Sequence, residues 1–138
     1  MTYLKSTESD FYPGVILTEL TALQRLHYLE YLSDEEERLL RDEGQEAGAV
    51  VISAMNIRIS TRLVALSLMA TQRSEIDPLD DEASKKAVLQ MQHEILSQWS
   101  WEGIAACAIQ VRRLSGMLPP EGREDEQDGE EAATAEKR

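Results

Sequence analysis

The sequence predicts a mainly α-helical fold: a small bundle of four to five helices, a short N-terminal β-hairpin and a disordered acidic C-terminal tail. Three observations lead to this prediction. Apolar residues recur at three- and four-residue spacings over most of residues 19–117, which is the period of a helix with one buried face. Pro13-Gly14 separates two short β-prone stretches, and the composition changes sharply after Pro120. We therefore expect a helical domain with the hairpin over residues 1–118 and a tail over residues 119–138.

The hairpin is predicted from residues 3–8 and residues 15–17. Pro13 and Gly14 suit the two central positions of a type II turn, because proline fixes φ at the first and glycine accepts a positive φ at the second. The stretch after the turn, Val15-Ile16-Leu17, is rich in β-branched residues. A two-stranded hairpin is marginal by itself, so we expect it to pack against helices.

Thr18 is the predicted N-cap of a first helix over residues 19–32. Its hydroxyl can accept a hydrogen bond from the first turn, and Glu19 places a negative charge where the helix dipole favours one. Leu20, Leu23 and Leu26 follow at helical spacing.

Ser33 precedes a run of four acidic residues, Asp34-Glu35-Glu36-Glu37. This order is typical of an N-cap with a solvated acidic first turn, so we expect the helix to restart over residues 34–42. A single bent helix is the alternative. A capped helix start explains the acidic run better than a metal site or a set of catalytic carboxylates.

Residues 49–72 carry the strongest helical pattern in the chain. Their apolar residues cover more than one face, which is typical of a central, buried helix. Arg58 and Arg62 lie one turn apart, so we expect their face to meet water or an acidic partner. The main stripe consists of Val50, Ala54, Ile57, Thr61, Val64 and Leu68.

A linker over residues 75–81 separates this helix from the next, because Pro78 cannot continue a helix. Asp80 or Asp81 can cap the following helix, predicted over residues 82–99. Helix capping also explains the acidic cluster at residues 77–82 better than a calcium loop, whose glycine and spacing are missing. The apolar positions of this helix are Ala83, Ala87, Val88, Met91, Ile95 and Trp99.

Ser100 is the predicted N-cap of a last helix, whose apolar residues run from Trp101 to Leu114. Gly116 is placed like the glycine that ends many helices in the left-handed conformation. Pro119-Pro120 then prevents the helix from extending.

The tail and the overall charge limit the possible partners. Residues 121–138 contain eight acidic and three basic residues and no large apolar side chain, so they cannot offset the entropy of ordering and are expected to be disordered. The whole chain has a formal net charge of −12. Such a charge repels phosphate backbones and anionic lipid headgroups. We therefore expect neither nucleic acid nor a membrane surface as a partner.

The sequence is that expected of a cytoplasmic protein. Cys107 is the only cysteine, so no internal disulfide can form. The first ten residues lack the apolar core of a signal peptide. Residues 47–70 are the most apolar segment, but Arg58 and Arg62 leave uncharged runs shorter than the ~20 residues that a membrane span needs.

No pattern of catalytic or metal-binding residues is found. His27 and His93 are far apart, and His93-Glu94 lacks the second histidine of a zinc-protease motif. Cys107 lies among alanines without an electropositive neighbour, as expected of a small core residue rather than a nucleophile. The sequence contains no glycine-rich phosphate loop. We expect a protein that is not an enzyme and that uses no cofactor and no metal.

Two sets of apolar side chains are candidates for lining a groove that binds another protein. One is the stripe Leu20, Leu23 and Leu26; the other is the set of adaptable methionines. Ordinary core packing is the alternative for each. The methionines are Met55, Met69, Met91 and Met117.

Four segments resemble the minor tail protein G family of lambda-like long-tailed phages. They occur in the order and at the spacing of that family across most of residues 3–117, and the stretch from Leu17 to Leu26 is the most specific. Residues 34–59 and the segment around Pro78 depart from the family pattern. The four segments are Leu4-Lys5 with Thr7-Glu8-Ser9, Leu17-Thr18-Glu19-Leu20-Thr21-Ala22-Leu23-Gln24-Arg25-Leu26, Leu63-Val64-Ala65-Leu66-Ser67-Leu68, and Glu94-Ile95-Leu96 through Trp99 to Arg113-Leu114-Ser115-Gly116-Met117.

The resemblance implies a tail assembly chaperone that acts in the host cell cytoplasm. Its client would be the tape measure protein, the long helical rod that sets tail length. A ribosomal frameshift near the end of the gene would add a domain that recruits the major tail tube protein. The chaperone would be absent from the finished virion. The oligomeric state is left open, a homo-oligomer included.

Recognition of a client helix in an apolar groove is the expected mechanism, with the acidic surface keeping the complex soluble. Two other interpretations are an acidic adaptor that binds a basic partner, as a mimic of DNA does, and a structural tail protein. An enzyme is a more distant one. The candidate client-binding residues are Leu20, Leu23, Leu26, Tyr28 and Leu29 in the first helix and Trp101, Ile104 and Ile109 in the last.

Overall fold

The structure, a computed structural model, describes residues 4–43, 48–72 and 81–117. The acidic tail, Pro119-Pro120 and most of the linker around Pro78 lie outside these residues. The predictions made for them therefore stay predictions.

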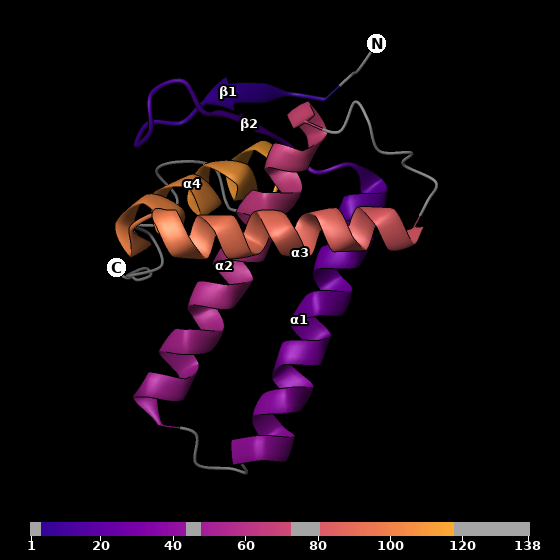
Figure 1. Cartoon of the computed structure of the whole chain (residues 1–138), viewed down its shortest axis with the longest axis vertical. Helices are drawn as coiled ribbons and strands as arrows, with labels where there is room; N and C mark the ends of the chain where they lie inside the picture. The colour runs from indigo at the N-terminus through magenta and orange to yellow at the C-terminus, as the bar shows by residue number, and fades with distance from the viewer. Residues whose placement is uncertain (1–3, 44–47, 73–80, 118–138) are drawn as a thin grey trace, which may run out of the picture.

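The described part of the chain is mainly helical, as predicted, with a β-hairpin followed by four helices. Figure 1 shows α1 and α2 side by side and antiparallel, α3 crossing over both, and α4 and the hairpin near the upper end of α2. Helix α2 is central, because it contacts α1, α3, α4 and β2. The elements are β1 (Ser6–Glu8), β2 (Ile16–Thr18), α1 (Ala22–Glu43), α2 (Ala49–Gln72), α3 (Asp81–Gln98) and α4 (Trp101–Leu114).

The hairpin forms around the predicted turn. The two strands are antiparallel, with Thr7 opposite Leu17. Gly14 has φ +89°, and the backbone N–H of Val15 donates to the carbonyl of Tyr12 over 3.1 Å. Pro13 and Gly14 therefore occupy the central positions of a type II turn, as the sequence predicts.

Helix α1 begins three residues later than predicted and runs without a break. Thr18 lies in β2, so the prediction of Thr18 as N-cap is wrong. Instead, Thr21 Oγ1 accepts from the backbone N–H of Gln24, and Gln24 Oε1 accepts from the backbone N–H of Thr21, both over 3.0 Å. This reciprocal pair is a capping box, and it outcompetes Thr18 because Thr18 is held in the strand.

The predicted restart at Ser33 is also wrong, and the single-helix alternative holds, because α1 continues from Ala22 to Glu43. Glu35 is therefore not part of a solvated helix start. It lies on the inner face of α1, is 6 % exposed, and pairs with Arg58 of α2.

Helix α2 has the predicted bounds and supplies most of the core. Leu63, Val64 and Ala65 are fully buried, whereas Val50 near the start of the helix is 81 % exposed. Figure 1 explains this difference, because α3, α4 and the hairpin surround the second half of α2 and only α1 runs beside the first half. The prediction of a central, buried helix therefore holds for its second half.

The segment Ala49–Met69 is also long and apolar enough to cross a membrane by length and composition alone, with a mean hydropathy of 1.5. Arg58 and Arg62 do interrupt its uncharged runs, as the sequence shows, but the segment as a whole passes this test with both arginines included. One such helix is weak support for a membrane span, since the core helix of a soluble protein passes the same test. Here the second half of the segment forms the core.

Helices α3 and α4 follow the predicted pattern. Helix α3 begins at Asp81 and buries Val88 and Ile95, whereas Asp80 lies outside the described residues. Ser100 caps α4, since its Oγ accepts from the backbone N–H of Gly103 over 3.1 Å.

The end of α4 is a Schellman motif. Gly116 has φ +74°, and its backbone N–H donates to the carbonyl of Arg113 over 3.2 Å. The N–H of Met117 donates to the carbonyl of Arg112 over 2.7 Å. These two bonds and the left-handed glycine define the motif and confirm the predicted helix end.

The hairpin is fixed to the helices by specific contacts. Ser67 Oγ donates to the carbonyl of Thr18 and accepts from its N–H, each over 2.7 Å. The hydroxyl of Ser9 is 3.2 Å from Cys107 Sγ in the core. The expectation that the hairpin needs helical support is therefore met through α2 and α4.

Candidate functional site

The described residues contain no group of three or more His, Cys, Asp or Glu side chains that could hold a metal ion. Cys107 is fully buried. Burial raises the pKa of its thiol, the nearby charge of Asp10 raises it further, and the hydrogen bond with Ser9 opposes both effects. A buried thiol of raised pKa is poorly suited to be a nucleophile, so Cys107 is a core residue, as predicted.

A groove lies between α1 and α3, and we call it the α1/α3 groove. Its volume is about 510 Å³. Leu23 on the α1 side and Leu89 on the α3 side are 48 % and 57 % exposed. The lining residues are Thr21, Leu23, Gln24, His27, Glu30, Tyr31 and Asp34 from α1, Arg62, Leu66 and Met69 from α2, and Ser84, Lys85, Val88 and Leu89 from α3.

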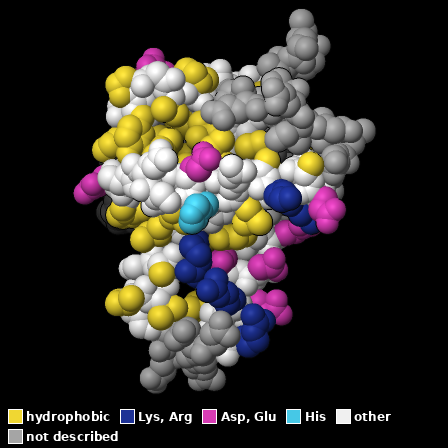
Figure 2. All heavy atoms as spheres, viewed as in Figure 1, with side chains coloured by type: hydrophobic (Ala, Val, Ile, Leu, Met, Phe, Trp, Pro, Cys, Tyr) yellow, Lys and Arg dark blue, Asp and Glu magenta, His cyan; other side chains and the backbone are white. Residues whose placement is uncertain are grey.

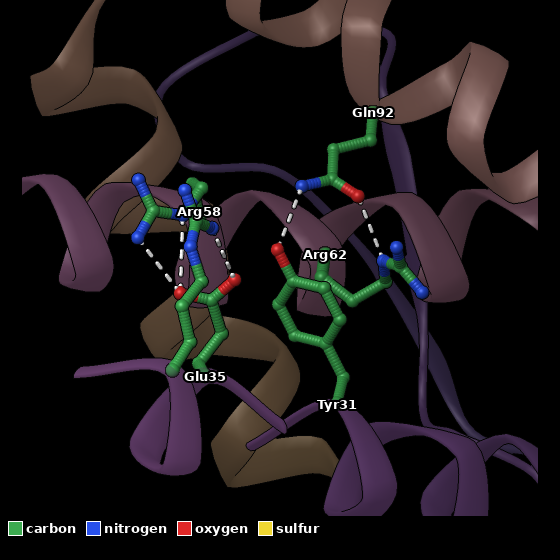
Figure 3. A network of polar contacts seen from close by, with 6 residues as sticks. Tyr31, Glu35, Arg58, Arg62 and Gln92 are labelled. Atoms are coloured by element: carbon green, nitrogen blue, oxygen red, sulfur yellow. Dashed lines mark hydrogen bonds and ion pairs between the residues drawn. The ribbon is translucent and has the colours of Figure 1, made fainter. Parts of the chain in front are cut away.

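A polar network joins the three helices at the base of this groove (Figure 3). Arg62 Nε donates to Gln92 Oε1 over 2.7 Å, and Gln92 Nε2 donates to the hydroxyl of Tyr31 over 3.3 Å. The guanidinium of Arg62 also lies 4.1 Å from the centre of the Tyr31 ring, a cation–π contact. Burial lowers the pKa of Arg62, while the charges of Tyr31 and Glu35 act in the opposite direction.

A second polar cluster ties α1 to α2 next to this network. Glu35 Oε1 accepts from Arg58 Nε over 3.1 Å and from Arg58 Nη2 over 2.8 Å. Glu35 Oε2 accepts from Arg38 Nη1 over 3.4 Å. The hydrogen bond to Glu35 raises the pKa of Arg58, although burial opposes this shift. The acidic partner predicted for the arginine face is thus a residue of the same chain.

The surface around the groove mixes apolar and charged side chains. Figure 2 shows apolar side chains along and above α3, and a run of Lys and Arg side chains below it, next to several Asp and Glu side chains. A smaller hollow of about 400 Å³ lies between the hairpin turn and α3, beside Gly14 and Trp99.

The structure divides the eight predicted client-binding residues into two groups. Leu20, Tyr28 and Ile104 are at most 8 % exposed and belong to the core, so the alternative of ordinary core packing describes them. The remaining five are between 39 % and 58 % exposed: Leu23, Leu26, Leu29, Trp101 and Ile109.

The structure does not bring these five exposed residues together. Of the five, Leu23 lines the α1/α3 groove, whereas Leu26 and Leu29 lie elsewhere on α1 and Trp101 and Ile109 lie on α4. Client binding by any of them stays a prediction.

Leu89, Arg62 and Tyr31 are groove residues that the sequence analysis did not single out as binding residues. Leu89 occupies the polar side of α3, where an exposed leucine is a weak but readable signal. The sequence predicts that the face of Arg62 meets water or an acidic partner, whereas Arg62 contacts Gln92 and Tyr31. Its place in the groove depends on how α3 crosses α1 and α2. Of the predicted methionines, Met69 lines the groove.

Comparisons with known proteins agree on one family. Residues 2–136 match the family described as "Bacteriophage lambda tail assembly chaperone, TAC, protein G". The chain is 31 % identical over 118 residues to tail assembly protein G of Escherichia phage N15, covering 86 % of this chain and 79 % of that protein. It is 34 % identical over 115 residues to tail assembly protein G of Escherichia phage lambda, covering 80 % and 76 %.

A longer relative is also matched. The chain is 31 % identical over 118 residues to tail assembly protein GT of phage N15, covering 86 % of this chain but 44 % of that protein. No solved structure matches the chain.

Proposed function

The chain belongs to the bacteriophage lambda tail assembly chaperone family, protein G, and from this premise we propose that it binds and solubilises the phage tape measure protein during tail assembly. The family's role is that of a chaperone and is not enzymatic. We propose accordingly that the chain acts by binding alone, without a catalytic step, in the cytoplasm of the host cell.

The α1/α3 groove is the observation that carries the proposal. Two helices, α1 and α3, form its sides, and Leu23 and Leu89 are exposed to solvent there. Exposed leucines on both sides of a hollow are typical of surfaces that receive an amphipathic helix. A tape measure protein is a helical rod with apolar stripes, so one of its stripes would cover Leu23 and Leu89.

The charge of the chain supports the solubilising part of the proposal. A formal net charge of −12 makes complexes that carry several copies repel one another, which opposes aggregation. Apolar contact would thus hold the client while the charge keeps the complex dispersed.

We further propose a second, longer product that hands the client to the tail tube. The match to protein GT, of which this chain covers 44 %, supports a form in which this domain is followed by another one. A frameshift would produce that form, and its added domain would recruit the major tail tube protein. The chaperone would then leave, and it would be absent from the virion.

The test is co-expression of the chain with the tape measure protein of the same phage, followed by measurement of soluble and co-purified client. The variants are Leu23→Asp with Leu89→Asp in the groove, and Leu40→Asp as control, since Leu40 is 67 % exposed on α1 and does not line the groove. The proposal predicts soluble client with the wild type and the control, and insoluble client with the groove variant.

Folded wild-type protein that leaves the client insoluble and unbound would contradict the proposal. The two rival functions then make their own predictions. A structural tail protein would be detected in purified virions by mass spectrometry. An acidic adaptor would bind a basic partner with a steep dependence on salt.

A further inference from the structure

Arg62 is a half-buried cation for which the described part of the chain supplies no ion-pair partner, although the charge of Glu35 lies close enough to act on it. Arg62 Nε donates a hydrogen bond to Gln92 Oε1, and the face of the guanidinium makes a cation–π contact with the Tyr31 ring. Glu35, which lies nearby, pairs instead with Arg58 and Arg38. Among the side chains that the structure describes, those of residues 4–41, 48–69 and 82–117, no carboxylate forms an ion pair with Arg62. In Figure 3 the dashed line from Arg62 leads from Nε to Gln92, and no dashed line joins its two terminal nitrogens to the other residues drawn.

The guanidinium of Arg62 is therefore a candidate binding group in the groove. Arg62 lines the α1/α3 groove, and two of its contacts, with Gln92 and Tyr31, hold the plane of the guanidinium in place. A fixed guanidinium with both terminal nitrogens available matches the two oxygens of a carboxylate. A cation that has lost part of its hydration gains most from such a partner.

The other charged residues of the groove restrict where a carboxylate can lie. Glu30 and Asp34 line the α1 wall, and Lys85 lines the α3 wall. A carboxylate next to the α1 wall would be repelled, whereas one next to the α3 wall would be attracted. A client carboxylate is therefore expected on the α3 side of the groove, the side on which Gln92 contacts Arg62.

We propose that Arg62 selects the client, so that the helix bound in the α1/α3 groove presents an Asp or Glu side chain within its apolar stripe, facing the α3 wall. This inference rests on the proposed function and adds a specificity-determining residue to it. The apolar rim supplies contact area, and the carboxylate–guanidinium pair fixes the register and direction of the client helix.

The first test measures binding of purified tape measure protein to the wild type, to Arg62→Gln and to Arg62→Lys. Arg41→Gln is the matched control, because it removes the same charge from an exposed position of α1 outside the groove. Loss of a charge-assisted, bidentate pair predicts binding weaker by about tenfold or more for Arg62→Gln, partial rescue by Arg62→Lys, and nearly unchanged binding for Arg41→Gln. The salt dependence should become shallower with Arg62→Gln.

The second test leaves this chain unchanged and so does not depend on the folding of a variant. In the tape measure segment that the complex protects from proteolysis, each Asp or Glu is replaced singly by Asn or Gln. One of these client replacements should weaken binding to the wild-type chain about tenfold. The same replacement should have little further effect on binding to Arg62→Gln, because the two residues would be coupled partners.

The outcomes separate the two proposals. If the wild type does not bind the tape measure protein, the proposed function fails and this inference fails with it. If the wild type binds, but Arg62→Gln binds equally well at every salt concentration and no acidic residue of the client matters, only the role of Arg62 is overturned.

Discussion

Single residues explain how the hairpin is held against α4. The ring of Tyr12 packs on Gly103, where an added Cβ would overlap the ring atoms. The same ring lies 4.6 Å from the ring of Trp99, and its hydroxyl accepts from the backbone N–H of Ser100 over 3.2 Å. Gly103 therefore leaves room for the Tyr12 ring. A glycine within a helix rarely reveals such a contact in the sequence, and we did not predict it.

Replacing Gly103 with alanine should displace the Tyr12 ring and loosen the hairpin. Overpacking costs about 1–3 kcal/mol, while the better helix propensity of alanine returns up to about 1 kcal/mol. We expect the free energy of unfolding to fall by about 1–2 kcal/mol, measured by urea denaturation.

The control for Gly103→Ala is the same substitution in a Tyr12→Ala background. There the alanine no longer meets a ring, so Gly103→Ala should be neutral or stabilising. An equal loss of stability in both backgrounds would show that the contact with Tyr12 is not the cause.

At the scale of elements, α1 shows what local patterns can and cannot predict. Ser33 with its acidic run fits the rule for a helix start, yet the helix continues, because Glu35 gains two hydrogen bonds from Arg58 of α2 by facing inward. The sequence analysis placed the cap at Thr18, whereas the structure has a capping box of Thr21 and Gln24. Choosing between them required the strand pairing of Thr18 with Ser6.

The observed cap at Thr21 and the predicted cap at Ser33 can be compared by alanine substitution. Thr21→Ala removes the side chain that accepts from Gln24 and should lower the free energy of unfolding by about 1 kcal/mol. Ser33→Ala should be neutral or slightly stabilising, since alanine has the better helix propensity. Urea denaturation of both variants checks this, and a loss at Ser33 that equals the loss at Thr21 would indicate a helix that starts anew at Ser33.

Patterns along single helices predicted the bounds of α2, the cap of α4 at Ser100 and the end of α4 at Gly116. These features depend on residues within one turn of each other. Of the groove lining, the sequence predicted only Leu23 and Met69, because one wall comes from α3. Sequence spacing within a helix does not reveal that Leu23, Arg62 and Leu89 would line the same groove.

At the scale of the whole molecule, the residues that form the core differ from the exposed residues that line the α1/α3 groove. The second half of α2 is enclosed by α1, α3, α4 and the hairpin and forms the core. Helix α3 crosses over α1 and α2 (Figure 1). The α1/α3 groove lies at this crossing, and its exposed leucines Leu23 and Leu89 add little to the core. Under the proposed function, a client helix would therefore bind and leave at the rim without disturbing the core.

The central claim is that the tape measure protein is bound in the α1/α3 groove. Hydroxyl-radical footprinting of the chain, alone and in complex with its purified client, tests this directly because it reports the solvent exposure of single side chains. We predict that oxidation of Leu23 and Leu89 falls strongly in the complex, while Leu40 and Val50 are oxidised as in the free chain. Formation of a stable complex in which Leu23 and Leu89 are oxidised at their free rates would contradict the claim.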